Sequence, residues 1–190
     1  PVAYFGEVVQ DGLLDMLDAG ALTAASATSL ALSREGQERL FADPARYADR
    51  VVVRSADVSN APSLIDRFGV VGVNSALEVD LYGHANATHL RGTHLVNGVG
   101  GGGHLERASA LGVVALGSTA ADGDVSRVVP MVPHVDHTAH DLSVVVTEHG
   151  VADLRGLGGR ERAREMISVA HPDFRPELRA YLDRAGDGAL

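Results

Sequence analysis

The sequence predicts an α/β fold in which helices flank a mostly parallel sheet. Short continuous apolar runs, typical of strands that are buried on both faces, alternate with segments of helical periodicity. Of the 190 residues, 45% are apolar and 22% are charged, which suits one domain with a substantial core. We therefore expect a single domain over residues 1–190, with residues 186–190 as a frayed tail.

Strands are expected where apolar residues follow one another without a helical period. The runs of this kind are 24–32, 51–53, 70–77, 78–82, 112–116 and 142–146. In open parallel sheets, ligands bind beyond the carboxyl ends of the strands. The polar loops after Leu77, Leu116 and Val146 are therefore where we expect functional residues.

Helices are expected where apolar residues recur every three or four positions between capping and breaking residues. The expected helices span 8–19, 33–41, 61–68, 105–111, 160–170 and 176–185. In the first of them, one face carries Val9, Leu13, Met16 and Leu17. The second begins at Ser33, whose hydroxyl can cap it.

The composition excludes several classes of protein. A formal net charge of −9 is opposite in sign to that of a general nucleic-acid or anionic-membrane binder. The absence of cysteine excludes disulfides, zinc ribbons and thiol nucleophiles. All 16 basic residues are arginine, which excludes a Schiff-base lysine and a P-loop. Because no targeting segment or long apolar stretch is visible, we expect a cytoplasmic protein.

The strongest local motif is the glycine run, residues 97–103, which reads Asn-Gly-Val-Gly-Gly-Gly-Gly before an expected helix. Glycine lets the backbone approach a ligand and turn its N–H groups inward, and a helix start adds further donors. The run therefore favours an anion or oxyanion site over the alternative, a flexible surface loop. It does not match the dinucleotide-binding pattern.

Glu7 lies just before the first expected helix, where a negative charge interacts favourably with the helix dipole. The local sequence favours that structural role. A buried carboxylate at this position could instead serve as a nucleophile or a general base.

A cluster of histidines and aspartates suggests a metal site. Its members are His134, Asp136, His137, His140 and Asp141. These residue types are common zinc ligands, so one reading is a metal-dependent hydrolase built on His134, His137 and His140. The alternative is a hydrogen-bonded turn that leads into the strand at 142–146, because the flanking residues do not have a helical pattern.

Two further polar pairs follow the last expected strand. Glu148 and His149 lie at its end, and Asp153 can pair with Arg155. We expect these residues to hold the loop together, with the arginine binding a carboxylate.

Several stretches together resemble the C-terminal domain of the acetyl-CoA hydrolase/transferase family, within the class I CoA-transferases. The family includes succinyl-CoA:acetate and 4-hydroxybutyrate CoA-transferases. The stretches that carry the resemblance are 6–11 (GEVVQD), 74–83 (NSALEVDLYG), 97–101 (NGVGG), 129–140 (VPMVPHVDHTAH), 147–156 (TEHGVADLRG) and 170–176 (AHPDFRP). They occur in order along nearly the whole chain.

The resemblance implies the CoA-transferase (NagB/RpiA-like) type of α/β fold and a catalytic glutamate that carries CoA as a thioester. By position, Glu7 matches that glutamate. Asn60 and the backbone N–H of Gly101 match the oxyanion donors. The CoA-binding glycines are then Gly98, Gly100, Gly101 and Gly102.

The implied substrates are an acyl-CoA and a small carboxylate, or an acyl-CoA such as acetyl-CoA and water. CoA is then a substrate, and neither a metal nor another cofactor is expected. The implied partners are an N-terminal domain or subunit of the same enzyme and further copies in a homo-oligomer, with no nucleic acid and no membrane. The alternative from another class is a non-catalytic CoA-binding or anion-binding module that lacks its N-terminal half.

The chain departs from the family pattern in two places. His104 and Leu105 follow the glycine run, where the family commonly has Asp-Phe. Ala121 stands where the family commonly has a lysine that contacts CoA. Arg107 and Arg127 are the candidates to supply the missing positive charge.

Overall fold

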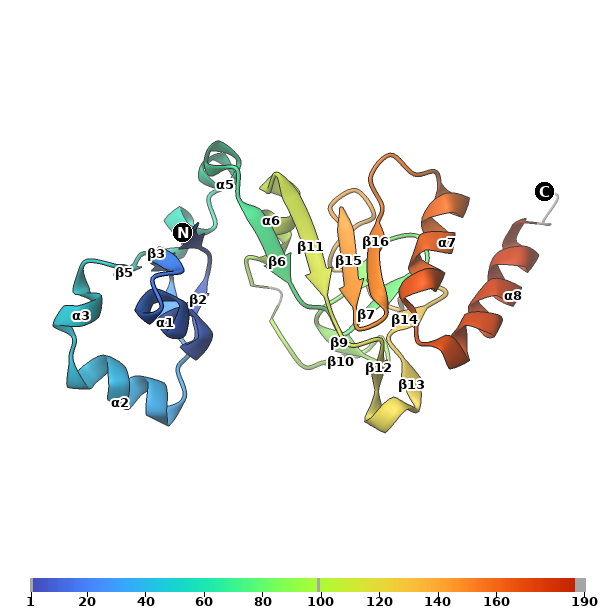
Figure 1. Ribbon diagram of the computed structural model, residues 1–190. Helices are drawn as coiled ribbons and strands as arrows, with labels where there is room; N and C mark the ends of the chain where they lie inside the picture. Colours follow the sequence, from blue (N-terminus) through green and yellow to red (C-terminus); the bar gives the residue numbers. More distant parts are fainter. Residues whose placement is uncertain (1, 99, 187–190) are drawn as a thin grey trace. The chain divides into compact units, whose positions relative to one another are not determined.

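The computed structural model describes residues 2–98 and 100–186, and these form two compact units, residues 1–70 and residues 71–190 (Figure 1). Each unit is described by itself. The expectation of a single domain stays a prediction, since two compact units can belong to one domain. Within the described residues, no helix combines the length and apolarity needed to cross a membrane.

Unit 1 is built on a three-stranded parallel sheet in the order β1-β3-β5. Its strands are β1 (Val2–Phe5), β3 (Leu22–Ala27) and β5 (Val51–Val53), and a small parallel pair joins β2 (Val8–Val9) to β4 (Ser29–Leu30). Its helices are α1 (Asp11–Asp18), α2 (Arg34–Ala42), α3 (Ala45–Ala48), α4 (Ala56–Ser59) and α5 (Pro62–Phe68). As expected, Ser33 caps α2, where its side chain accepts a hydrogen bond from the backbone N–H of Gly36.

The first expected helix begins three residues late, so the prediction of a helix from residue 8 is wrong. Val8 and Val9 form β2 because they pair with β4, a partner 21 residues further along the chain. The predicted apolar face is confirmed for Val9, Leu13 and Leu17, which lie in or against the core, and is wrong for Met16. Leu14 and Leu17 are the buried side chains of α1, whereas Met16 is 38% exposed.

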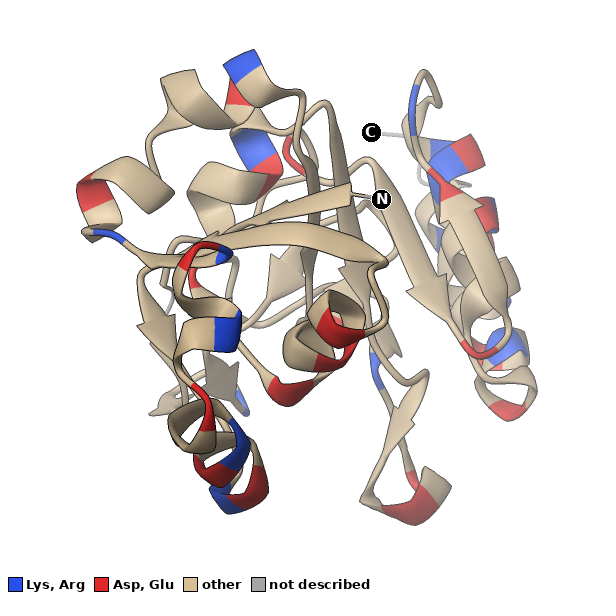
Figure 2. Cartoon of the chain, turned by 60° about the vertical axis from the view of Figure 1, so that its left-hand side comes forward, with Lys and Arg blue, Asp and Glu red and all other residues tan. Residues whose placement is uncertain are grey.

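Charged residues of unit 1 lie on its helices and loops, and its strands carry none (Figure 2). On α1, Asp15 pairs with Arg39 of α2 at 2.7 Å. Asp18 accepts hydrogen bonds from Arg46 at 2.8 Å and from the hydroxyl of the buried Tyr47 at 2.9 Å. These contacts tie α1 to α2 and α3 around the apolar core of the unit.

The prediction that strand 51–53 is buried is wrong for most of it. Val52 is 38% exposed and Val53 is 57% exposed. The reason is topological, because β5 is an edge strand with β3 as its one neighbour.

Unit 2 contains a four-stranded sheet in the order β16-β15-β11-β6, and its first three strands along the chain pair in parallel. They are β6 (Val71–Asn74), β11 (Leu111–Ala115) and β15 (Val144–Thr147), and β16 (Gly150–Asp153) adds antiparallel to β15. A second sheet joins β14 (Val128–Val129), β7 (Glu78–Asp80) and β8 (Ala85–Asn86). Two antiparallel strand pairs are also present. They are β9 (His89–Leu90) with β10 (His94–Leu95), and β12 (Thr119–Ala120) with β13 (Val125–Ser126). The fold is therefore mixed α/β with mostly parallel sheets, as predicted.

The described part of unit 2 also contains the helices α6 (Gly102–Ala108), α7 (Gly159–Val169) and α8 (Arg175–Gly186). Short 3₁₀ turns are η1 (Ala121–Gly123) and η2 (Pro172–Phe174). Helix α7 packs on β15 and β16, α8 packs on α7, and α6 packs on β6 and β11 (Figure 1). Helix α6 begins three residues earlier than expected, inside the glycine run. Gly186 ends α8, so the predicted tail beyond it lies outside the described residues.

Candidate active site

The main chain of Glu7 is fixed at the carboxyl edge of the unit 1 sheet. Glu7 follows the end of β1 by two residues. Its backbone oxygen accepts hydrogen bonds from the backbone N–H groups of Thr28 at 2.8 Å and Ser29 at 2.9 Å, just beyond the end of β3. Parallel strands bring these two loops to the same edge, and the half-buried side chain of Glu7 starts from this fixed backbone.

The side chain of Asn60 meets the carboxylate of Glu7. Asn60 is the C-cap of α4, and its backbone N–H donates to the oxygen of Ala56 at 2.8 Å. From there its side-chain Nδ2 donates to Oε1 of Glu7 at 2.8 Å. The structure thus brings together two predicted catalytic residues that are 53 positions apart in the sequence.

The glycine run lies in unit 2 and leads into α6. Gly100 has a φ of 55°, in the left-handed region that favours glycine. Gly101 is buried and is the N-cap of α6. A side chain on Gly102 would lie 3.2 Å from Cε1 of the His137 ring. Gly98 is exposed with open space around its Cα, and Val99 lies outside the described residues.

Two of these glycines therefore have a structural reason to be glycine. Gly100 needs its backbone conformation, and Gly102 needs the space that His137 occupies. Gly101 has a φ of −87°, so its backbone conformation does not require glycine. The predicted donor role of its backbone N–H and the CoA-binding role of the run stay predictions.

A buried carboxyl group lies on α6, the helix that begins within the glycine run. Glu106 is 2% exposed, and its Oε1 accepts a hydrogen bond from Nδ2 of Asn74 at 2.9 Å. No described residue donates to its Oε2. Burial raises the pKa of Glu106 to about 7, and the single amide donor offsets only part of that effect. Asn74 also lies close to Gly102, so the pair supports the start of the helix.

The predicted ligand set His134, His137 and His140 is not brought together. His137 is buried and its pKa is lowered by burial, whereas His140 is exposed. Asp141 binds the guanidinium of Arg107 at 3.0 and 3.2 Å, and this contact lowers its pKa to about 2. The segment is a hydrogen-bonded turn, the alternative considered above, because its groups bind neighbours elsewhere in unit 2.

Glu148 has a defined partner at the carboxyl edge of the unit 2 sheet. Its carboxylate accepts hydrogen bonds from the hydroxyl and, at 2.9 Å, the backbone N–H of the fully buried Ser118. The hydroxyl hydrogen bond is the main cause of its lowered pKa of about 2. The sequence pointed to the loops after β11 and β15 but did not identify Ser118.

The expected pair of Asp153 and Arg155 is present. Arg155 binds Asp153 at 2.6 and 2.9 Å and lowers the pKa of Asp153 to about 2.

The arginines proposed to replace the missing lysine are both engaged within the fold. Arg107 binds Asp141, as above. Arg127 donates to the backbone oxygens of Ala76 and Leu77. Ala121 begins the 3₁₀ turn η1 with a φ of 51°. No described contact therefore identifies a substitute for the lysine.

The raised pKa of Glu106 predicts a loss of stability as the pH rises. The folded state keeps the proton up to about pH 7, whereas the unfolded chain releases it near 4.5. The stabilising effect is therefore complete below pH 4.5 and is lost between 4.5 and 7, about 3 kcal/mol in all. Glu106→Gln keeps the acceptor for Asn74 and should remove this pH dependence in urea unfolding of the full chain.

The matched control for that experiment is Glu165→Gln, on the exposed face of α7. It should follow the wild type at every pH. If the Glu106→Gln and wild-type curves fall in parallel between pH 4.5 and 7, the carboxyl of Glu106 is ionised throughout.

Comparison with known proteins gives one consistent family. Residues 36–182 match the model of the acetyl-CoA hydrolase/transferase C-terminal domain. The chain is 42% identical to a propanoyl-CoA:succinate CoA transferase of Escherichia coli, over 100% of this chain and 39% of that protein. It is 48% identical to an acetyl-CoA hydrolase of Candida glabrata, over 94% of this chain and 35% of that protein.

Solved structures that resemble this chain support the same family. RipA from Yersinia pestis superimposes with a TM-score of 0.82 at 31% identity, over 96% of this chain and 44% of RipA. A 4-hydroxybutyrate CoA-transferase from Porphyromonas gingivalis gives a TM-score of 0.76 at 28% identity, over 96% of this chain and 45% of that chain. The chain thus spans less than half the length of the proteins that it matches.

Proposed function

This chain belongs to the acetyl-CoA hydrolase/transferase family, and we propose that it carries the catalytic glutamate of a CoA-transferase or acetyl-CoA hydrolase. The observation that carries the proposal is the hydrogen bond from Asn60 to the carboxylate of Glu7. The names of the relatives support both activities, since they include CoA-transferases and acetyl-CoA hydrolases.

In the proposed reaction, a carboxylate oxygen of Glu7 attacks the thioester carbonyl of an acyl-CoA. The C–S bond breaks, CoA leaves as a thiolate, and an acyl-glutamyl anhydride remains. The thiolate then attacks the glutamyl carbonyl and releases the acyl group as a carboxylate, which leaves CoA on Glu7 as a thioester. An acceptor carboxylate takes CoA by the reverse steps, whereas water in its place gives hydrolysis.

The contact with Asn60 gives that residue a defined part in these steps. Oε1 of Glu7 becomes an oxyanion when the thiolate attacks the glutamyl carbonyl. The Nδ2 of Asn60 already donates to this atom, so it needs little rearrangement to stabilise the charge. A donor of this kind commonly contributes ~2.7–4 kcal/mol to transition-state stabilisation. We assign the backbone N–H of Gly101 to the second oxyanion that the reaction forms.

Glu7→Asp should fold normally but lose most of its activity in the full-length enzyme. Aspartate keeps the charge but retracts the carboxylate by one methylene, and a misplacement of ~1 Å can cost about a hundredfold in rate. Intact-protein mass spectrometry after addition of acyl-CoA should show a CoA adduct on the wild type and none on Glu7→Ala. Borohydride should reduce the thioester and leave the wild type inactive.

Glu165→Asp is the matched control, because Glu165 is an exposed carboxylate on α7, and it should leave both rate and adduct unchanged. An adduct that maps to Glu148 or Glu78 instead of Glu7 would contradict the assignment. It would leave the family membership intact.

The glycine run provides a second test, in which Gly101→Val is compared with Gly103→Val. Both residues lie at the start of α6, but Gly101 is buried, and a side chain on Gly103 would meet open space. We expect Gly101→Val to reduce turnover at least tenfold while its melting temperature stays close to that of the wild type. Gly103→Val should have little effect on either quantity. Equal activity of the two variants would exclude Gly101 as the donor.

We also propose that turnover needs an N-terminal domain, because the relatives are more than twice as long as this chain. The 190-residue chain alone should show little or no CoA transfer. Activity should rise when the chain is expressed in one polypeptide with such a domain. Full activity of the chain by itself would refute this proposal.

Three other expectations stay predictions. They are that the reaction needs no further cofactor, that the protein forms a homo-oligomer and that it is cytoplasmic.

A further inference from the structure

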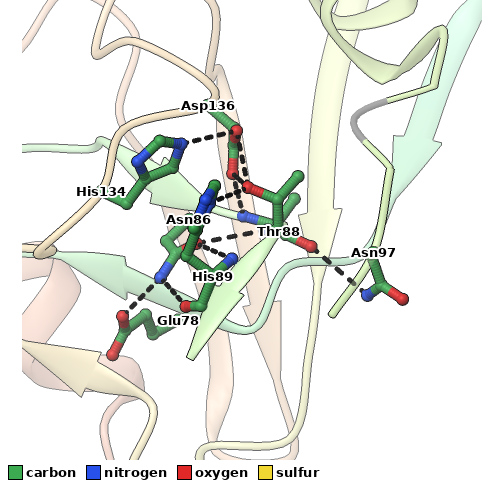
Figure 3. Close-up of polar contacts among 8 residues, drawn as sticks. Glu78, Asn86, Thr88, His89, Asn97, His134 and Asp136 are labelled. Atoms are coloured by element: carbon green, nitrogen blue, oxygen red, sulfur yellow. Dashed lines mark hydrogen bonds and ion pairs between the residues drawn. The ribbon is translucent and has the colours of Figure 1, made fainter. Parts of the chain in front are cut away.

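A group of possible metal ligands lies in unit 2, apart from the residues assigned to the reaction. It consists of His89 on β9 and of His134 and Asp136 in the segment between β14 and β15 (Figure 3). Each residue offers one ligand atom, and these three atoms lie within 4.8 Å of one another. All three residues are half-buried, so a cation could enter from solvent.

Asp136 is held firmly, and both of its carboxylate oxygens have partners. Its Oδ2 accepts hydrogen bonds from the backbone N–H of Ala87 and the hydroxyl of Thr88, each at 2.7 Å. Its Oδ1 lies 3.0 Å from the same hydroxyl and faces Nε2 of His134 at 3.2 Å. Two ligands of a tetrahedral zinc ion at about 2.0–2.1 Å from the metal are about 3.3–3.4 Å apart, so this pair already has a suitable spacing.

The hydrogen bonds of His89 leave one of its ring nitrogens free to bind a metal. The hydroxyl of Thr88 donates to Asp136, so its oxygen accepts from Nδ1 of His89 at 2.6 Å. This places the proton of a neutral ring on Nδ1 and leaves the lone pair on Nε2. Metal-binding histidines commonly show this pattern, in which the second ring nitrogen donates to an oxygen that orients the ring.

The two imidazole rings lie against each other, with centroids 3.8 Å apart and planes inclined by 40°. Two protonated rings at this distance would repel each other. The lone pairs lie in the ring planes, so one ion can bind both rings only along their nitrogen edges. To bind one ion the rings must open slightly. The side chain of His134 can do so because it is 36% exposed and contacts Asp136 as its described ion-pair partner.

We propose that His89, His134 and Asp136 form a binding site for a divalent transition-metal ion of the zinc class, with water as the fourth ligand. Two imidazoles and one carboxylate are a common donor set for such ions. The site is separate from the proposed reaction, which uses no metal, and metal binding can be measured whether or not the proposed function is correct.

The position of the site suggests what the ion would do. The backbone oxygen of Thr88 accepts hydrogen bonds from the backbone N–H groups of Val96 at 2.8 Å and Asn97 at 3.4 Å. The side chain of Asn97 also donates to the oxygen of Ala87 (Figure 3). Residues 87–89 thus hold the first residue of the glycine run, and an ion that fixes His89 to Asp136 would stabilise this segment.

The test is a calorimetric titration of the chelator-treated full chain with ZnCl₂, followed by Co²⁺ as a spectroscopic probe. We expect one zinc ion per chain, a higher melting temperature, and the visible absorption bands of tetrahedral Co²⁺. Binding should weaken in acid, because protons compete with the ion for its ligands.

Two substitutions identify the ligands. His134→Gln should weaken zinc binding at least tenfold and abolish the Co²⁺ bands without unfolding the metal-free chain. His140→Gln is the matched control, since His140 is an exposed histidine six residues away, and it should bind zinc as the wild type does. The proposal is wrong if one equivalent of zinc does not bind, if His134→Gln binds it unchanged, or if His140→Gln removes it.

Discussion

Parallel pairing requires the strands of a sheet to end at the same edge, and both units of this protein depend on that constraint. In unit 1, β1 and β3 end side by side, so the loop after β3 can hold the backbone of Glu7. In unit 2, β11 and β15 end side by side, so Ser118 can bind Glu148. In both units the polar groups therefore gather where the regular backbone hydrogen bonds stop.

Burial and hydrogen-bond donors shift the pKa values of two carboxyl groups of unit 2 in opposite directions. Glu148 accepts several hydrogen bonds, and its pKa falls to about 2. Glu106 is buried with one amide donor, and its pKa rises to about 7. The first environment holds a charge, whereas the second holds a proton through much of the acid range.

The glycine run is held from two directions in unit 2. On one side, Asn74 and His137 pack against Gly102 at the start of α6. On the other, the backbone of Thr88 holds Asn97, and Thr88 is itself bound to Asp136. A segment rich in glycine loses much conformational entropy when it is ordered, so contacts at both ends are needed to fix it. The proposed cation would strengthen one of these ends, and the proposed oxyanion donor lies between them.

The features that the sequence determined by itself are those with local causes. Continuous apolar runs placed β11 and β15 within two residues of their observed bounds, and Ser33 caps α2 as its hydroxyl predicts. The family followed from motifs spread over nearly the whole chain. The sequence could also name Glu7 and Asn60 through that resemblance, although the local pattern around Glu7 favoured a merely structural charge.

The tertiary structure decided which residues that are distant in the sequence pair with each other. Val8 and Val9 became a strand because β4 supplies their hydrogen-bond partners. Asn60 reaches Glu7 across 53 positions, and His134 and Asp136 are joined by the distant His89 in place of His137 and His140. Periodicity and capping describe only neighbours along the chain. Which side chains share a site depends on how strands pair and where they end, and that is fixed only when the whole unit packs.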